Sequence, residues 1–248
     1  MANALYEVYR PACWDQLVGH ARHKRAIEGL KRRGSLGGRA FWISGSSGIG
    51  KTSMAYLIAG EVCDPDNFLE VDAGELTPKG LEDLERLLRC RAIGDKCGRA
   101  VLINEAHGLR KDSIRKLLVV LERIPNHVTW VFTTTAQGQQ ALFEDIDSHP
   151  LLSRCLKFEL QVEDCAAEIV ERAQAIAETE GLGGASLREY QKLAKECRYN
   201  LRDILTHIET GEMMRSAKPA AASVRGDYDM AAIQRLMAQQ EEIPCPAN

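Results

Sequence analysis

The sequence predicts a parallel α/β domain followed by a small helical domain. Three observations lead to this prediction. Short apolar runs alternate with amphipathic helical patterns, a glycine-rich loop follows the first run, and only helical spacing remains after residue 161. Alternation of this kind requires crossover connections, which place parallel strands in one sheet with helices on both faces. We therefore expect an α/β fold with a helical appendage.

The elements of the α/β part can be placed in order along the chain. Residues 21–33 have helical spacing and end at a cluster of glycines. The later runs are short and largely apolar, as expected for strands that a parallel sheet buries on both faces. The predicted strands are residues 40–44, 68–72, 100–104 and 128–134, and the predicted helices between them are residues 51–62, 80–90 and 111–123.

Helical patterns alone make up the next part of the chain. Amphipathic spacing predicts helices over residues 162–180, 186–197 and 200–211. Residues 214–226 are rich in Ala, Ser, Lys and Pro, which is typical of a linker, and residues 228–240 form a short helix pattern. The predicted domains are an α/β domain over residues 1–160, a helical domain over residues 161–212, and a linker with a short helix over residues 213–248.

The composition narrows the function classes. With 248 residues, of which 45% are hydrophobic, the chain is long enough for one large and one small core. A formal net charge of −3 lacks the basic excess of a general nucleic-acid binder, so any DNA contact would be local. No apolar run suits a signal peptide or a membrane span, so we expect a cytoplasmic protein. The eight cysteines include no C-x-x-C pair, which favours reduced thiols over a zinc site.

A contiguous glycine-rich motif joins the first predicted strand to the next helix. Its glycines let the backbone curl so that N–H groups point at phosphates, and the helix adds the positive end of its dipole. Lys51 would bridge the terminal phosphates of a nucleotide, and Thr52 would ligate Mg²⁺. We expect ATP and Mg²⁺ as cofactors, with the nucleotide bound by Gly45, Ser46, Ser47, Gly48, Ile49, Gly50, Lys51, Thr52 and Ser53.

A second polar motif ends the buried strand at residues 100–104. Asn104 and Glu105 close its apolar run. In a doubly wound sheet this strand end lies beside the phosphate-binding loop. The segment resembles a Walker B motif, and this resemblance implies that Glu105 polarises an attacking water. The alternative interpretation is a strand end with two solvated polar residues.

With these two motifs the chain resembles the AAA+ ATPases, and among them the clamp-loader subunits of the replication factor C and DNA polymerase III gamma type. The resemblance covers about residues 9–211. The family has an opening box that packs against adenine. A similar stretch here consists of Tyr9, Arg10 and Pro11 and the following residues, which include Val18. For Arg10 and Pro11 an ordinary ordered turn is the alternative. The resemblance implies a P-loop NTPase sheet flanked by helices and followed by a small helical lid.

The resemblance also implies roles for three polar residues around the nucleotide. Asn104 stands where the family usually has an aspartate associated with Mg²⁺, so we expect a metal contact there and slow hydrolysis. Thr134 matches sensor 1, which positions the attacking water, although threonine is also simply a good strand residue. Arg202 matches sensor 2, which contacts the phosphates from the lid, unless it pairs with Asp203 or Glu196 on the helix surface.

Other basic residues are expected to reach beyond the chain's own nucleotide. Arg154 lies in a Leu-Ser-Arg-Cys stretch similar to the Ser-Arg-Cys motif of clamp loaders, whose arginine crosses to the neighbouring subunit's nucleotide. A guanidinium suits this task because it is always charged and offers a planar fork to phosphate oxygens. Helices begin at Lys79, Arg110 and Lys111 on the edge where the resemblance places DNA, although a solvated helix face explains these residues nearly as well.

The expected function is that of an AAA+ ATPase subunit that acts in an oligomer, as a clamp-loader-like motor in DNA replication or repair. The expected partners are other AAA+ subunits, a sliding clamp and primer-template DNA, with no membrane. The alternatives are a nucleotide-binding switch or scaffold with little hydrolysis, which Asn104 favours, and a helicase loader. The sequence ends soon after the predicted lid, so we expect the family's ring-closing collar to be missing or supplied by another chain. The four-cysteine zinc insertion of some bacterial relatives is also absent.

Overall fold

The chain is built on a parallel β-sheet. The structure is a computed structural model that describes residues 4–138 and 149–214. Its sheet has five strands in the order β2-β3-β4-β1-β5, and each neighbouring pair is parallel. The strands are β1 (Arg39–Gly45), β2 (Phe68–Asp72), β3 (Arg99–Asn104), β4 (Val128–Thr134) and β5 (Leu156–Leu160).

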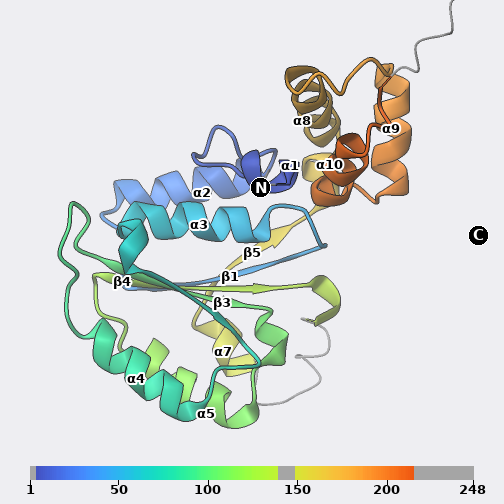
Figure 1. Cartoon of the computed structure of the whole chain (residues 1–248). Helices are drawn as coiled ribbons and strands as arrows, with labels where there is room; N and C mark the ends of the chain where they lie inside the picture. The colour runs from blue at the N-terminus through green and yellow to red at the C-terminus, as the bar shows by residue number, and fades with distance from the viewer. Residues whose placement is uncertain (1–3, 139–148, 215–248) are drawn as a thin grey trace, which may run out of the picture. The chain divides into compact units, whose positions relative to one another are not determined.

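Helices cover both faces of this sheet, which confirms the predicted fold class. In Figure 1, α2 and α3 lie on one face, and α4, α5 and α7 lie on the other. Because every strand runs in the same direction, the loops that follow the strands gather at the carboxyl ends of the strands. The helices are α1 (Leu5–Val8), α2 (Ala21–Arg32), α3 (Lys51–Val62), α4 (Pro78–Leu88), α5 (Lys111–Leu121) and α7 (His149–Ser153).

Each face of the sheet has its own hydrophobic core, because successive side chains of a strand point to opposite sides. In β1, Phe41 and Ile43 join the core beneath α2 and α3, whereas Trp42 joins the core on the opposite face. There Trp42 stacks on Phe132 with ring centres 5.6 Å apart, and Trp130 lies 6.4 Å from Phe132. This packing fixes the strand ends that carry the polar motifs.

The helical segment after the sheet consists of α8 (Ala166–Thr179), α9 (Leu187–Glu196) and α10 (Leu201–Glu209). A capping box between Ser186 and Glu189 begins α9. Asn200 begins α10, where its side chain accepts hydrogen bonds from two backbone N–H groups. Buried residues of all three helices belong to the same core as α2 and α3. The predicted helices are therefore present, while a domain boundary at residue 161 stays a prediction.

The prediction misses three elements, each for a physical reason. The strand β5 reads Leu-Lys-Phe-Glu-Leu and lies at a sheet edge, where Lys157 and Glu159 are exposed. It therefore lacks the continuous apolar run that marks a strand buried on both faces. The helices α1 and α7 are too short to show helical periodicity. The predicted linker beyond Met214 and the helix at residues 228–240 lie outside the described residues.

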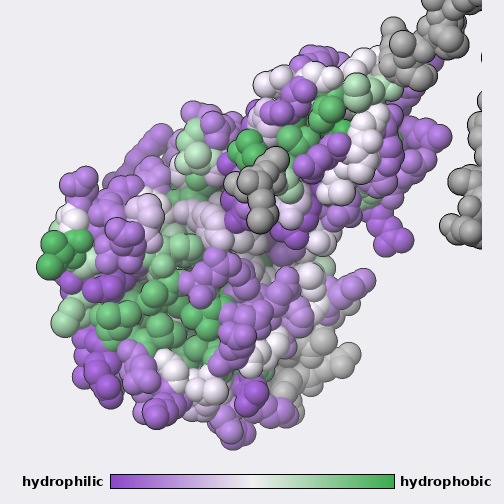
Figure 2. All heavy atoms as spheres, viewed as in Figure 1, coloured by the Kyte–Doolittle hydropathy of each residue, from purple (hydrophilic) through white to green (hydrophobic). Residues whose placement is uncertain are grey.

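The surface is mostly hydrophilic on the side that Figure 2 shows. Apolar side chains on that side gather at the sheet edge between α3 and α4. The edge strand β2 contributes side chains that are only partly buried, those of Phe68, Leu69 and Val71.

Within residues 4–138 and 149–214, no helix is long and apolar enough to cross a membrane.

Candidate functional site

The loop between β1 and α3 has a shape that glycine permits. Gly45, Gly48 and Gly50 have φ angles of 156°, 70° and 103°, in the left-handed region that other residues rarely adopt. Gly48 is constrained further, because a Cβ atom there would lie 1.6 Å from Oδ1 of Asn200. The loop curls into the N-terminus of α3, where free N–H groups and the helix dipole favour an anion.

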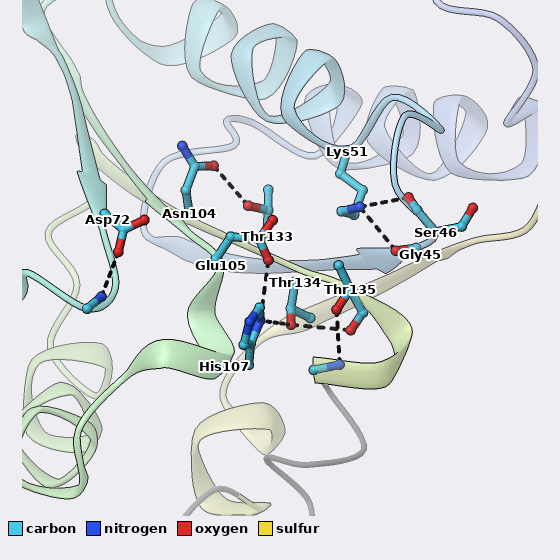
Figure 3. Close-up of polar contacts among 12 residues, drawn as sticks. Gly45, Ser46, Lys51, Asp72, Asn104, Glu105, His107, Thr133, Thr134 and Thr135 are labelled. Atoms are coloured by element: carbon cyan, nitrogen blue, oxygen red, sulfur yellow. Dashed lines mark hydrogen bonds and ion pairs between the residues drawn. The ribbon is translucent and has the colours of Figure 1, made fainter. Parts of the chain in front are cut away.

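Lys51 opens α3 and is buried against this loop, with 8% of its surface exposed. Its Nζ donates hydrogen bonds to the carbonyl oxygens of Gly45 at 3.1 Å and Ser46 at 2.7 Å (Figure 3). Burial lowers the pKa of Lys51, and the nearby carboxylate of Glu105 opposes this shift. Because both hydrogen-bond acceptors are neutral carbonyls, the ammonium charge favours an anion in front of the loop.

A cavity opens beside the glycine-rich loop. Its wall is formed by the N-terminal segment, the loop itself, Glu105 after β3, and residues of α8 and α10. The structure thus brings segments from the start, middle and end of the described chain to one cavity. The sequence-predicted residues in its wall are Arg10, Pro11, Val18, Ser47, Gly48, Ile49, Gly50, Lys51, Thr52, Ser53, Glu105 and Arg202.

Arg10 holds the N-terminal wall of the cavity against α3. Its guanidinium carbon lies 5.0 Å from the centre of the Tyr56 ring, and its Nη2 lies 2.8 Å from Oε1 of Glu7. Tyr56 projects from α3 about one turn beyond Thr52. Pro11 and Val18 add apolar surface to the cavity wall beside Arg10.

Arg202 reaches the cavity from the N-terminus of α10. Its guanidinium carbon lies 5.4 Å from the centre of the Tyr6 ring, and its charge contributes to lowering the pKa of Lys51. Asn200 accepts a hydrogen bond from the backbone N–H of Arg202 at 3.1 Å. Sequence reasoning missed Tyr6 and Asn200 as cavity neighbours. An asparagine followed three residues later by Asp203 signals a helix start, but not the contact with Gly48.

Asn104 ends β3 and bonds to side chains of both neighbouring strands, of which Figure 3 shows the bond to Thr133. Its Oδ1 accepts from the hydroxyl of Thr133 on β4 at 2.9 Å. Its Nδ2 donates to Oε1 of Glu70 on β2. Sequence reasoning assigned no role to Glu70 or Thr133, because only the strand order β2-β3-β4 brings them to Asn104.

Glu105 and Thr134 are linked by His107. The Nδ1 atom of His107 lies 3.3 Å from Oε2 of Glu105 and 3.2 Å from Oγ1 of Thr134. Glu105 has a left-handed φ of 49°, which turns the chain directly after β3. The wall of the cavity includes Glu105 but neither Thr134 nor His107. The sensor role of Thr134 stays a prediction, and Thr133 is the threonine that bonds to Asn104.

Arg154 lies outside the wall of this cavity. Its Nη2 pairs with Oε1 of Glu122, just after α5, at 2.5 Å, and its Nη1 donates to the carbonyl of Pro150 at 2.8 Å. The hydrogen bond from Arg154 lowers the pKa of Glu122. In its own chain Arg154 is therefore held by a carboxylate, which leaves its predicted action on a neighbouring subunit open to test.

The predicted DNA contacts lie at the N-termini of the two helices on the opposite face of the sheet. Lys79 is the second residue of α4, whose N-cap Thr77 accepts from the N–H of Gly80 at 3.1 Å. Arg110 is the N-cap of α5 and Lys111 its first residue. Both helices begin beyond the carboxyl ends of neighbouring strands, β2 and β3. Basic side chains and helix N-termini of this kind can bind phosphates. Their contact with DNA stays a prediction.

Comparison with known proteins identifies the class of the α/β part that carries the glycine-rich loop and Glu105. Residues 41–163 match the family described as "ATPase family associated with various cellular activities (AAA)". The chain therefore contains an AAA ATPase domain, and this match confirms the resemblance predicted from its motifs. The chain is also a homologue of proteins named as gamma and tau subunits of DNA polymerase III.

Two of these relatives show how far the similarity extends. The chain is 30% identical over 230 residues to DNA polymerase III subunit tau of Escherichia coli (strain K12), covering 82% of this chain and 34% of that protein. It is 29% identical over 182 residues to DNA polymerase III subunit gamma of Buchnera aphidicola subsp. Acyrthosiphon pisum (strain APS), covering 62% and 46% respectively. The chain thus spans only about a third of the length of the tau subunit, 34%.

A solved structure supports the fold independently. The RuvB Holliday junction branch migration motor of Thermotoga maritima superposes with a TM-score of 0.60 at 23% identity. The match covers 81% of this chain and 64% of that one. At this identity the similarity shows a shared fold, a parallel sheet flanked by helices.

Proposed function

We propose that this chain binds Mg-ATP in the cavity beside the glycine-rich loop and acts as a clamp-loader-like ATPase subunit in DNA replication. The observation that carries the proposal is the cavity itself, because the loop, Lys51 and Arg202 meet there from distant parts of the sequence. An AAA domain related to gamma and tau subunits of DNA polymerase III supports the same conclusion.

The residues present suit ATP and Mg²⁺. Lys51 and Arg202 would pair with the phosphates, whereas the wall of Arg10, Pro11 and Val18 would hold the base. The curled loop and the start of α3 would supply backbone N–H groups to the phosphates. Thr52 and Asn104 would hold Mg²⁺, which supplies charge stabilisation during phosphoryl transfer. Glu105 is the carboxylate in the cavity wall that would orient the attacking water.

The proposal includes neighbouring subunits. Arg154 lies outside its own cavity, which is compatible with a role at the nucleotide of an adjacent AAA+ subunit. Lys79, Arg110 and Lys111 would contact the phosphates of primer-template DNA, and a sliding clamp would be the protein partner. We infer these partners from the family resemblance. The relatives' names, which are those of DNA polymerase III subunits, agree with a role in DNA replication.

A second function is favoured by one specific residue. Asn104 replaces the acidic side chain expected at the end of β3, and it is engaged by Thr133 and Glu70. With a neutral amide at this position, Mg²⁺ would be held less firmly, so the subunit would bind ATP with little turnover. In that case the chain is a nucleotide-dependent switch or scaffold within a mixed oligomer.

A steady-state ATPase assay with and without primer-template DNA separates these functions. The ATPase proposal expects hydrolysis that DNA increases and that Glu105→Gln abolishes, with nucleotide binding retained. The switch expects binding without measurable turnover under both conditions. A native protein that binds no nucleotide would contradict both functions.

A further inference from the structure

The amide of Asn104 has a definite orientation across the sheet. Its oxygen accepts from Thr133 on β4, and its nitrogen donates to Glu70 on β2. The strand order β2-β3-β4-β1 puts Thr133 on the side of the glycine-rich loop, which follows β1, and Glu70 on the opposite side. Figure 3 shows the Asn104 oxygen directed at Thr133. The oxygen of Asn104 therefore faces the loop side of the sheet.

Glu70 is the residue that fixes this orientation. An ionised carboxylate only accepts hydrogen bonds, so it must face the Nδ2 group of Asn104 rather than its oxygen. The second oxygen of Glu70 accepts from the hydroxyl of Tyr56 at 2.6 Å. Tyr56 lies about one turn beyond Thr52 on α3. The two hydrogen bonds therefore hold the carboxylate of Glu70 between α3 and the end of β3.

We propose that Glu70 is a positioning residue of the Mg²⁺ site. It turns the Asn104 oxygen toward the loop and supplies, from the neighbouring strand, the negative charge that asparagine lacks. The inference rests on the proposed binding of Mg-ATP and adds a residue that the motifs do not include. Groups that hold metal ligands from behind typically change metal affinity by about 10–100-fold when they are removed.

The pair also predicts how position 104 responds to substitution. An aspartate there would have no N–H to donate to Glu70, and it would set two carboxylates against each other. The exchange of carboxylate and amide between the two positions, Glu70→Gln with Asn104→Asp, keeps one negative charge and one amide. Glu70 and Asn104 should therefore tolerate a joint exchange better than either single change.

The test follows the binding of a fluorescent ATP analogue, first in EDTA and then across a series of Mg²⁺ concentrations. For Glu70→Gln, we expect the Mg²⁺ concentration that gives half-maximal strengthening of binding to rise about tenfold, with binding in EDTA unchanged. The double exchange should return it toward the native value. Asp72→Asn is the matched control, because it removes a carboxylate from the same strand that bonds to the N–H of Gly74. It should leave the Mg²⁺ requirement unchanged.

A second readout needs neither metal nor nucleotide. Urea unfolding of the native protein, both single variants and the double exchange forms a double-mutant cycle, and we expect the double exchange to be more stable than the two single effects predict together. Any one of three results would overturn the inference. The first is a Glu70→Gln variant with the native Mg²⁺ requirement, and the second is an Asp72→Asn variant whose Mg²⁺ requirement rises as much as that of Glu70→Gln. The third is a double-mutant cycle in which the two changes in unfolding free energy simply add. A native protein without nucleotide affinity would instead overturn the proposed function and this inference with it.

Discussion

Asn200 and Gly48 meet where the helical segment approaches the glycine-rich loop. Asn200 caps α10 through hydrogen bonds to the N–H groups of Arg202 and Asp203, at 3.1 and 3.3 Å. Its Oδ1 occupies the space that a Cβ on Gly48 would need, 1.6 Å away from that position. The absence of a side chain at Gly48 therefore allows α10 to bring Arg202 to the cavity.

Substitution of Gly48 by alanine tests this relationship. We expect Gly48→Ala to weaken ATP binding, because the added methyl group displaces Asn200 and strains a residue with φ of 70°. Gly60→Ala is the control, since a Cβ on Gly60 in α3 meets nothing within 4 Å and alanine favours a helix by about 1 kcal/mol. Binding titrations and urea unfolding of both variants check this. Native affinity in Gly48→Ala would show that α10 can withdraw without loss.

The trans role of Arg154 predicts complementation between two inactive variants. Arg154→Ala should lower hydrolysis strongly, since a trans-acting arginine contributes about 10³–10⁵-fold in rate. Mixed with Lys51→Ala, it should regain activity where an intact Arg154 faces an intact nucleotide site. Arg123→Ala, which alters an exposed neighbour of Glu122, is the control. If mixed oligomers form and no activity returns, Arg154 acts within its own chain or only supports the fold through Glu122.

Two histidines predict a loss of stability in acid. His20 is 1% exposed, and its Nε2 lies 3.0 Å from the carbonyl oxygen of Ile49. Burial lowers the pKa of His20, and it lowers that of His23 as well. The unfolded chain therefore binds protons more readily than the folded one, so stability falls as the pH drops below about 6.5.

Substitution of His20 separates its part of this effect. His20→Gln keeps an N–H group for the Ile49 carbonyl but cannot gain charge, so unfolding free energies should fall less between about pH 8 and about pH 5. His23 should retain a smaller pH dependence. His207→Gln, at the end of α10 with its side chain 43% exposed, serves as the control. An unchanged pH dependence in His20→Gln would assign the acid sensitivity to other groups.

The sequence predicts those parts of the site that are contiguous in the chain. The glycine-rich loop, Lys51 and Thr52 form one motif whose backbone requirements are visible in the residues themselves. The central strands are equally clear, because burial on both faces demands continuous apolar runs. The structure places these elements as expected, with β1 leading directly into the loop and α3.

The parts that the sequence does not reveal depend on pairing between distant segments. Glu70 reaches Asn104 only because β2 lies beside β3, and Asn200 reaches Gly48 only because α10 packs near the loop. The edge strand β5 alternates exposed charges with apolar residues, so its pattern differs from that of the central strands. Tertiary contacts of this kind leave no local periodicity or motif to recognise.

The proposed function depends most directly on nucleotide binding through Lys51. Lys51 lies in the cavity wall, and its buried ammonium donates hydrogen bonds to two neutral carbonyls of the loop. Hydrogen bonds to charged groups contribute about 1.5–3 kcal/mol, so Lys51→Ala should lower affinity for a fluorescent ATP analogue by about 10- to 100-fold. Lys192→Ala, which removes an exposed lysine from α9, should bind as the native protein does. Equal affinity of native protein and folded Lys51→Ala would contradict the central claim.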